Sequence, residues 1–184
     1  MSLRIISGRW RGRRLTVSGP PGLRPTSDRV RETLFNWLAP DIVGARCLDL
    51  FCGTGALGLE ALSRGAAYCT SVDSDRRCCG RLRQVGQEWG AEGLCVHRRD
   101  AIAWLCSAAE SDFRCDIAFL DAPFFEADLL LSALTRLPPV LSPGGLVYCE
   151  SAGDDFTRQQ GWNVVRSSRT GAVCFGLLRR ATRS

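Results

Sequence analysis

Several residue types and patterns that often reveal a protein's chemistry are missing from this sequence. It contains no lysine, a single histidine (His97) and no pair of cysteines separated by two residues. Because zinc sites need closely spaced cysteine and histidine ligands, a site of that kind is excluded and we expect no bound metal. The apolar runs are far shorter than the roughly 20 residues that cross a membrane. Residues 1–6 lack the apolar segment of a signal peptide, so we expect a cytoplasmic protein without membrane contact.

The ten cysteines are interpreted as reduced thiols. Several, such as Cys47, Cys115 and Cys149, lie in apolar runs, where a free thiol acts as a small hydrophobic side chain. Cys52 differs because it lies in a glycine-rich turn, although a small residue tolerated there is the simpler interpretation. The length of 184 residues suffices for one domain with a sizeable core, and we expect a single domain over residues 1–184.

Positive charge is concentrated at the start of the chain. Residues 1–31 contain eight arginines and one acid, Asp28, for a net charge of +7, whereas residues 32–184 contain sixteen arginines and eighteen acids, for a net charge of −2. A basic segment beside a nearly neutral domain is typical of contact with an anionic polymer. An ordinary solvated face is the alternative interpretation.

The most informative stretch runs from Asp49 to Gly58. An apolar run at 47–51 predicts a buried strand, glycines follow at positions 53, 55 and 58, and an apolar segment compatible with a helix begins at residue 56. Such a turn suits a nucleotide-type ligand, because glycine lets the ligand approach the main chain and the helix N-terminus presents free N–H groups. The glycine spacing, with Asp73 about 20 residues on, also fits a dinucleotide-binding fingerprint. A tight turn in an unrelated α/β domain is a third interpretation.

Asp49 favours a cofactor other than NAD. It lies within the tip of the predicted strand, four residues before the first glycine. A carboxylate there repels a pyrophosphate and attracts a positively charged ligand. S-adenosyl-L-methionine carries an ammonium and a sulfonium and no phosphate. The pattern Asp-x-x-x-Gly-x-Gly therefore fits this cofactor better, and it resembles the first motif of the Rossmann-like methyltransferases.

Strands and helices are predicted to alternate after this point. The apolar patterns predict further strands at 68–73, 94–97, 116–120 and 145–150, helices at 56–64, 75–89, 101–108, 126–136 and 154–160, and a closing hairpin of 162–167 and 172–178. This alternation predicts an α/β fold with a mainly parallel sheet covered by helices on both faces. Ligands of such sheets bind beyond the carboxyl ends of the strands.

A basic hairpin is predicted at the N-terminus. Residues 5–6 and 15–17 form its strands and flank a turn between Gly8 and Gly12. An aromatic ring between arginines suits a base or ribose stacked between phosphate contacts. Trp10 holding the hairpin against the rest of the protein is an equally weighted alternative. The predicted RNA-binding residues are Arg9, Trp10, Arg11, Arg13, Arg24 and Arg29.

A helix is predicted to follow this hairpin, with Thr26 or Ser27 as its cap and Pro40 at its end. We expect Arg29 and Arg31 on its outer side or flank. The buried stripe at helical spacing consists of Val30, Leu34, Trp37 and Leu38.

Acids follow several of the predicted strands at the same edge of the sheet. Asp73, with Asp75 as its rival, can accept both hydroxyls of an adenosine ribose, and Asp100 with Ala101 can accept from the adenine amino group. A helix cap or a solvated loop acid is the alternative for each. The agreement with Asp49 at one edge favours the cofactor interpretation.

The segment Asp121-Ala122-Pro123-Phe124 is the second informative stretch. It resembles the (Asn/Asp/Ser)-Pro-Pro-(Tyr/Phe) motif of methyltransferases that act on exocyclic amines. Such an amine is a poor nucleophile because its lone pair is delocalised, and acceptors on its N–H groups stabilise the charge that develops. Asp121 and the carbonyl of Ala122 can be these acceptors, and Phe124 can stack on a flipped-out base. Ala122 departs from the motif, which has proline there; the carbonyl remains and the turn loses rigidity.

Taken together, the chain resembles the bacterial 16S ribosomal RNA guanine-N2 methyltransferases. The matching stretches are Arg4 to Arg13, Gly22 to Pro40, Asp49 to Arg64, Asp121 to Phe124 and Tyr148 to Ser151. The second of these is the most specific, because methyltransferases in general lack it. Beyond Glu150 the resemblance fades.

This resemblance implies a seven-stranded sheet, S-adenosyl-L-methionine as methyl donor, and a guanine N2 target in assembled or partly assembled small subunits. A single small domain with a basic segment is compatible with a monomer. It divides the domain into a hairpin extension (1–20), a family-specific helix (22–40) and a catalytic core (45–180). The implied catalytic residues are Asp121, Ala122, Pro123 and Phe124. The implied cofactor-binding residues are Asp49, Phe51, Gly53, Thr54, Gly55, Asp73, Ser74, Asp100 and Ala101.

Three other functions remain open from the sequence. The first is an adenine-N6 or other amine methyltransferase acting on DNA or another RNA. The second is an RNA-binding or assembly module that has lost catalysis, for which Ala122 is the only hint. An NAD-dependent oxidoreductase is the least favoured, because of the charge of Asp49.

Overall fold

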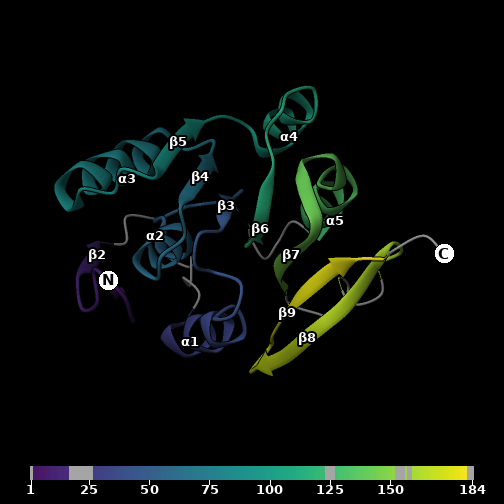
Figure 1. Ribbon diagram of the computed structural model, residues 1–184, viewed down its shortest axis with the longest axis horizontal. Helices are drawn as coiled ribbons and strands as arrows, with labels where there is room; N and C mark the ends of the chain where they lie inside the picture. The colour runs from purple at the N-terminus through teal and green to yellow at the C-terminus, as the bar shows by residue number, and fades with distance from the viewer. Residues whose placement is uncertain (1, 17–26, 123–126, 152–155, 157–158, 182–184) are drawn as a thin grey trace.

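The computed structural model describes residues 2–16, 27–122, 127–151, 156 and 159–181. Its centre is a seven-stranded sheet in the order β5-β4-β3-β6-β7-β9-β8 (Figure 1). The strands are β3 (Arg46–Asp49), β4 (Tyr68–Asp73), β5 (Leu94–Arg98), β6 (Cys115–Leu120), β7 (Leu141–Ser151), β8 (Trp162–Thr170) and β9 (Val173–Arg180). Strands β3 to β7 run parallel, and β9 lies antiparallel between β7 and β8. The predicted seven-stranded, mostly parallel sheet is confirmed.

Helices cover both faces of this sheet. The helices are α1 (Asp28–Trp37), α2 (Ala56–Ser63), α3 (Arg76–Trp89), α4 (Ala101–Ala109) and α5 (Ala127–Arg136), with a short 3-10 helix, η1 (Pro138–Val140). Figure 1 shows α1, α2 and α3 on one side of the sheet together with the N-terminal hairpin, and α4 and α5 on the other side. None of the described helices is long and apolar enough to span a membrane.

Alternation along the central strands builds two separate cores. Cys47, Ile117 and Phe119 pack with α1 and α2, whereas Leu48 and Leu120 pack with α4 and α5. Because side chains alternate between the faces of a strand, Asp49 lies on the same face as Cys47. Its carboxylate therefore points toward the layer of α1 and α2.

The N-terminal hairpin forms, but its first strand is not where the sequence predicts it. The strands are β1 (Ser2–Arg4) and β2 (Arg14–Thr16), with Leu3 opposite Leu15. The prediction of a strand at residues 5–6 is wrong. Ile5 still exchanges hydrogen bonds with Gly12 and Arg13, but the N–H groups of Ile6 and Ser7 are hydrogen-bonded to the carboxylate of Glu60 instead of to a partner strand.

Helix α1 is capped by Ser27, whose side chain accepts a hydrogen bond from the N–H of Val30 at 3.3 Å. The predicted apolar stripe is buried except for Trp37, which is half-buried and stacks on Phe175 with ring centroids 5.5 Å apart. The expectation that Arg31 lies on the outer side is wrong. Its side chain is fully buried between α1, α2 and the hairpin, where it finds Asp28 and Glu60 as partners. The predicted helix at 154–160 falls mostly outside the described residues.

Candidate active site

Four aspartates meet at the carboxyl edge of the parallel strands, as the sequence predicts. Asp49 ends β3, Asp73 ends β4, Asp121 directly follows β6, and Asp100 lies two residues beyond β5. Because β5, β4, β3 and β6 are neighbours in the sheet and run parallel, these ends lie side by side. This edge is where ligands of such folds bind.

The glycine turn joins β3 to α2 at the centre of this edge. Gly53 has a φ of +50°, a conformation that side chains rarely adopt. A Cβ at Gly53 would find no atom nearer than 4.0 Å, so a ligand can approach the main chain there. Gly58 is different: a Cβ there would lie 2.7 Å from the Sγ of Cys69, so this glycine serves the close packing of α2 on β4. Phe51 and Thr54 in the same turn are half-buried.

Asp49 lies beneath the turn and not on its surface. Only 1% of the residue is exposed, and its Oδ2 accepts a hydrogen bond of 3.1 Å from the N–H of Gly58 in the first turn of α2. Burial raises the pKa of Asp49 to about 7; the Gly58 N–H opposes this rise, and the charges of Asp121 and Asp73 add to it. The site therefore holds negative charge that a bound cation would relieve.

Asp73 holds the glycine turn, and Asp75 does not. The Oδ2 of Asp73 accepts a hydrogen bond of 2.8 Å from the N–H of Gly53. Asp75 instead caps α3, and the N–H groups of Cys78 and Arg77 lower its pKa. Asp73 is partly exposed beside the turn, whereas Ser74 is exposed. Of the two candidates for a ribose, Asp73 is thus the one that lies against the glycine turn.

Asp100 has a structural role that the sequence analysis gave as its alternative. Its Oδ1 caps α4 by accepting a hydrogen bond of 2.8 Å from the N–H of Ala103. Ala101, the first residue of that helix, is buried in the core beside α5. Contact of either residue with an adenine stays a prediction.

Asp121 lies beside a buried pair that the sequence analysis did not assign. Asp121 is half-buried and Ala122 is buried, while Pro123 and Phe124 lie outside the described residues. On the adjacent β7, the hydroxyl of Tyr148 donates a hydrogen bond of 2.7 Å to Glu150. Burial, followed by the charges of Glu150 and Asp121, raises the pKa of Tyr148 well above its usual value. The sequence signal that could have indicated this pair is a tyrosine and a glutamate two residues apart near the end of a predicted strand.

Cys52, the cysteine in the glycine turn, is not exposed to a ligand. The Cys52 thiol is buried, and burial, followed by the charges of Asp49 and Asp73, raises its pKa, which favours the neutral thiol over the nucleophilic thiolate. All ten cysteines are free thiols.

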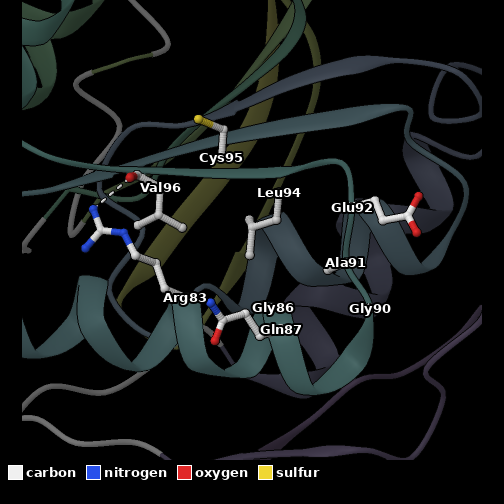
Figure 2. A pocket seen from close by; sticks show the side chains of 9 residues that line it. All are labelled: Arg83, Gly86, Gln87, Gly90, Ala91, Glu92, Leu94, Cys95 and Val96. Atoms are coloured by element: carbon white, nitrogen blue, oxygen red, sulfur yellow. Dashed lines mark hydrogen bonds between the residues drawn. The ribbon is translucent and has the colours of Figure 1, made fainter.

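A pocket of about 440 Å³ lies away from the carboxylates, between the later part of α3 and β5 (Figure 2).

The N-terminal hairpin is fixed to the body through Trp10. Trp10 is only 4% exposed, and its Nε1 donates a hydrogen bond of 3.1 Å to the carbonyl of Trp89. The prediction that this indole stacks on an RNA base is therefore wrong for this conformation. The structure shows the alternative, in which Trp10 anchors the hairpin to the rest of the protein. The predicted RNA contacts Arg9, Arg11, Arg13 and Arg29 are exposed, and Arg24 lies outside the described residues.

A buried carboxylate, Glu60, completes this attachment and was missed by the sequence analysis. Besides the N–H groups of Ile6 and Ser7, it accepts a 2.7 Å hydrogen bond from the Nε of Arg64, and Arg31 Nη1 lies 3.9 Å away. Glu60 is the only charged residue in α2, and a lone acid in an apolar helix was the signal for it.

Comparisons with known proteins agree with this geometry. Residues 3–179 match the family described as Conserved hypothetical protein 95. The chain is 43% identical to Ribosomal RNA small subunit methyltransferase D of Escherichia coli, over 97% of this chain and 90% of that protein. It is 42% identical to the solved structure of yhhF from Escherichia coli, with a TM-score of 0.86 and full coverage of both chains. The fold is also that of SMU.776, solved in complex with SAH, at 15% identity, a TM-score of 0.72, and coverage of 90% of this chain and 53% of that one.

Proposed function

Because the chain belongs to the Conserved hypothetical protein 95 family and is related to a ribosomal RNA small subunit methyltransferase, we propose that it methylates the N2 amine of a guanine in small-subunit ribosomal RNA. It is an S-adenosyl-L-methionine-dependent methyltransferase. The observation that carries the proposal is the convergence of the glycine turn, Asp73 and Asp121 at one edge of the sheet.

The residues at this edge fit the cofactor. The open main chain at Gly53 leaves room for it, and Asp73 lies beside the turn with its carboxylate partly exposed. The negative charge around Asp49 suits a ligand that carries positive charge. When bound, S-adenosyl-L-methionine supplies an electrophilic methyl group.

Asp121 and Ala122 would act on the amine. The carboxylate of Asp121 and the main-chain carbonyl of Ala122 accept hydrogen bonds from the two N–H groups, which localises the lone pair on nitrogen. The same acceptors stabilise the positive charge that develops on the nitrogen as the new N–C bond forms and the bond from the methyl group to the donor sulfur breaks. The carboxylate of Asp121 can then take up the proton that the methylated amine loses. Proximity at one sheet edge supplies a further part of the acceleration. Small-subunit particles are the proposed substrate, and a monomer is the proposed active form.

The deciding experiment uses small subunits that lack the modification. They are incubated with the protein and labelled S-adenosyl-L-methionine, and the RNA is digested to nucleosides. We expect the label in N2-methylguanosine. Label in N6-methyladenosine would replace the substrate and keep the enzyme class, and absence of label would contradict catalysis and make Ala122 the first residue to replace by proline.

The role of Asp121 is tested separately. Asp121→Ala should lower the rate of transfer by about 100-fold or more, while S-adenosyl-L-methionine affinity, measured by calorimetry, stays nearly unchanged. Asp112→Ala, at an exposed acid outside the site, is the matched control. Loss of about tenfold in cofactor affinity, or about 1.4 kcal/mol, would count against the assigned role.

A further inference from the structure

The hairpin tip and the proposed site of methyl transfer lie at opposite edges of the sheet. Helix α2 begins at the glycine turn and ends at Ser63, and the N–H groups of Arg9 and Trp10 are hydrogen-bonded to Ser63. Eight residues of α-helix span about 12 Å. Arg9 and Arg11 in the tip therefore lie too far from the carboxylate edge to touch the target base.

Helix α3 connects these two edges. Its N-cap, Asp75, follows β4 at the carboxylate edge, and its last residue, Trp89, contacts Trp10 of the hairpin with ring centroids 5.8 Å apart. The guanidinium of Arg13 lies over the ring of Trp89, 5.4 Å from its centroid. Fourteen residues of helix make this connection about 20 Å long.

Two exposed arginines lie at the start of one row of α3 residues along this path. Arg77, Arg81, Val85 and Trp89 are spaced by four and so lie in one row on the helix. Arg77 and Arg81 are exposed, and among the described residues neither forms an ion pair. Arg83 lies on the other flank of α3, where it donates a 2.8 Å hydrogen bond to the carbonyl of Val96 beside the pocket (Figure 2).

We propose that Arg9, Arg11, Arg13, Arg77 and Arg81 form one RNA-binding surface, here termed the hairpin–α3 strip, which holds the RNA that flanks the target nucleotide. The proposal rests on an RNA substrate. A strip of about 20 Å spans roughly six base steps at about 3.4 Å each. Exposed arginines that form no ion pair among the described residues suit phosphates, and the indole of Trp10 is buried and therefore not available for base stacking.

The test compares two double variants of equal charge. Arg77→Gln with Arg81→Gln removes the α3 part of the strip, and Arg114→Gln with Arg136→Gln removes two exposed arginines from the layer of α4 and α5. Equilibrium binding of each protein to unmodified small subunits is measured between 50 and 300 mM salt. The strip variant should bind about tenfold more weakly near 0.1 M salt, with a salt slope smaller by about 1.5; the control should match the unchanged protein.

Each outcome decides between the two proposals. A strip variant with unchanged affinity and slope, or a control that loses as much, overturns the strip even where the unchanged protein forms N2-methylguanosine. If the unchanged protein forms no methylated nucleoside, but the strip variant still shows the smaller salt slope of RNA binding, the strip is retained and the proposed reaction is overturned. Thermal unfolding and S-adenosyl-L-methionine affinity should be the same for all three proteins, because the substituted side chains are exposed and lie outside the cofactor site.

Discussion

Asp49 and Glu60 are both buried carboxylates, but their environments differ. Glu60 lies within α2, and Asp49 accepts a hydrogen bond from the first turn of the same helix. Glu60 is fully buried and has two main-chain N–H groups and the guanidinium of Arg64 as hydrogen-bond partners, with Arg31 close by. Asp49 accepts a hydrogen bond from Gly58 and has Asp121 and Asp73 as charged neighbours. One carboxylate is compensated by its surroundings, and the other is surrounded by like charge.

The difference separates stability from function. A compensated buried charge fixes the hairpin against α2, and removing it leaves its partners unsatisfied. An uncompensated one gains from any cation that enters the site, so its environment is typical of ligand binding. The two carboxylates should therefore respond oppositely to neutralisation.

The largest effect is expected for Glu60→Gln. The amide keeps one acceptor, but the buried Arg31 loses one of its two counter-charges and keeps only Asp28, while Arg64 loses its ion-pair partner. We expect the free energy of unfolding to fall by about 3 kcal/mol, as for other broken buried ion pairs. Urea denaturation measures this.

Two controls accompany Glu60→Gln. Glu110→Gln, at an exposed acid on the far side of the sheet, should change stability by less than about 0.5 kcal/mol. Asp49→Asn, at pH 8, should be nearly neutral or stabilising. Equal losses for Asp49→Asn and Glu60→Gln would remove the distinction between the two carboxylates.

A second prediction concerns the contact that holds Asp49. Gly58→Ala would put a methyl group 2.7 Å from Cys69 Sγ and 3.2 Å from Asp49 Oδ2. We expect a loss of about 1–3 kcal/mol in unfolding free energy and weaker cofactor binding. Gly80→Ala in α3 is the matched change, because a Cβ there meets no atom within 4 Å; it should stabilise by about 0.5–1 kcal/mol. A stable Gly58→Ala protein would show that the turn is loosely packed.

The sequence predicts the site better than the anchor for a physical reason. Strand ends and the glycine turn are encoded by neighbouring residues, so the edge that carries Asp49, Asp73 and Asp121 could be predicted from local patterns. The Arg31–Glu60 pair joins residues 29 positions apart, and nothing local to α1 distinguishes Arg31 from a solvated arginine. Trp10 was evenly balanced between RNA and anchor, because its partner, Trp89, lies 79 positions away.

The pH dependence of cofactor binding is a third prediction. With a pKa of about 7 in the folded protein and about 3.9 unfolded, ionised Asp49 destabilises the fold as pH rises from about 4 to 7, and a bound cation reverses that penalty. Affinity for S-adenosyl-L-methionine should rise by up to about tenfold from pH 6 to pH 8 and then level off.

Two comparisons isolate Asp49 as the source of that dependence. S-adenosyl-L-homocysteine (SAH) has the same ammonium and carboxylate as S-adenosyl-L-methionine but no sulfonium, so its affinity for the protein should vary less with pH. Asp49→Asn should flatten the profile of S-adenosyl-L-methionine. Identical profiles for the two ligands, or an unchanged profile in the variant, would assign the titration to another group. Calorimetry at constant ionic strength gives both.

The smallest effect is expected at Arg13, which belongs to the anchor and to the proposed RNA surface at once. Both Arg13 and Arg11 are exposed, but the guanidinium of Arg13 lies over Trp89, whereas Arg11 makes no cation–π contact among the described residues. Arg13→Gln should lower the unfolding free energy by about 0.5–1 kcal/mol through the lost cation–π contact. Arg11→Gln should leave stability unchanged, and both should reduce the salt slope of RNA binding by a similar amount. Equal stabilities would show that Arg13 serves RNA alone, and an RNA loss confined to Arg13→Gln would show that the hairpin acts on RNA through its packing on α3.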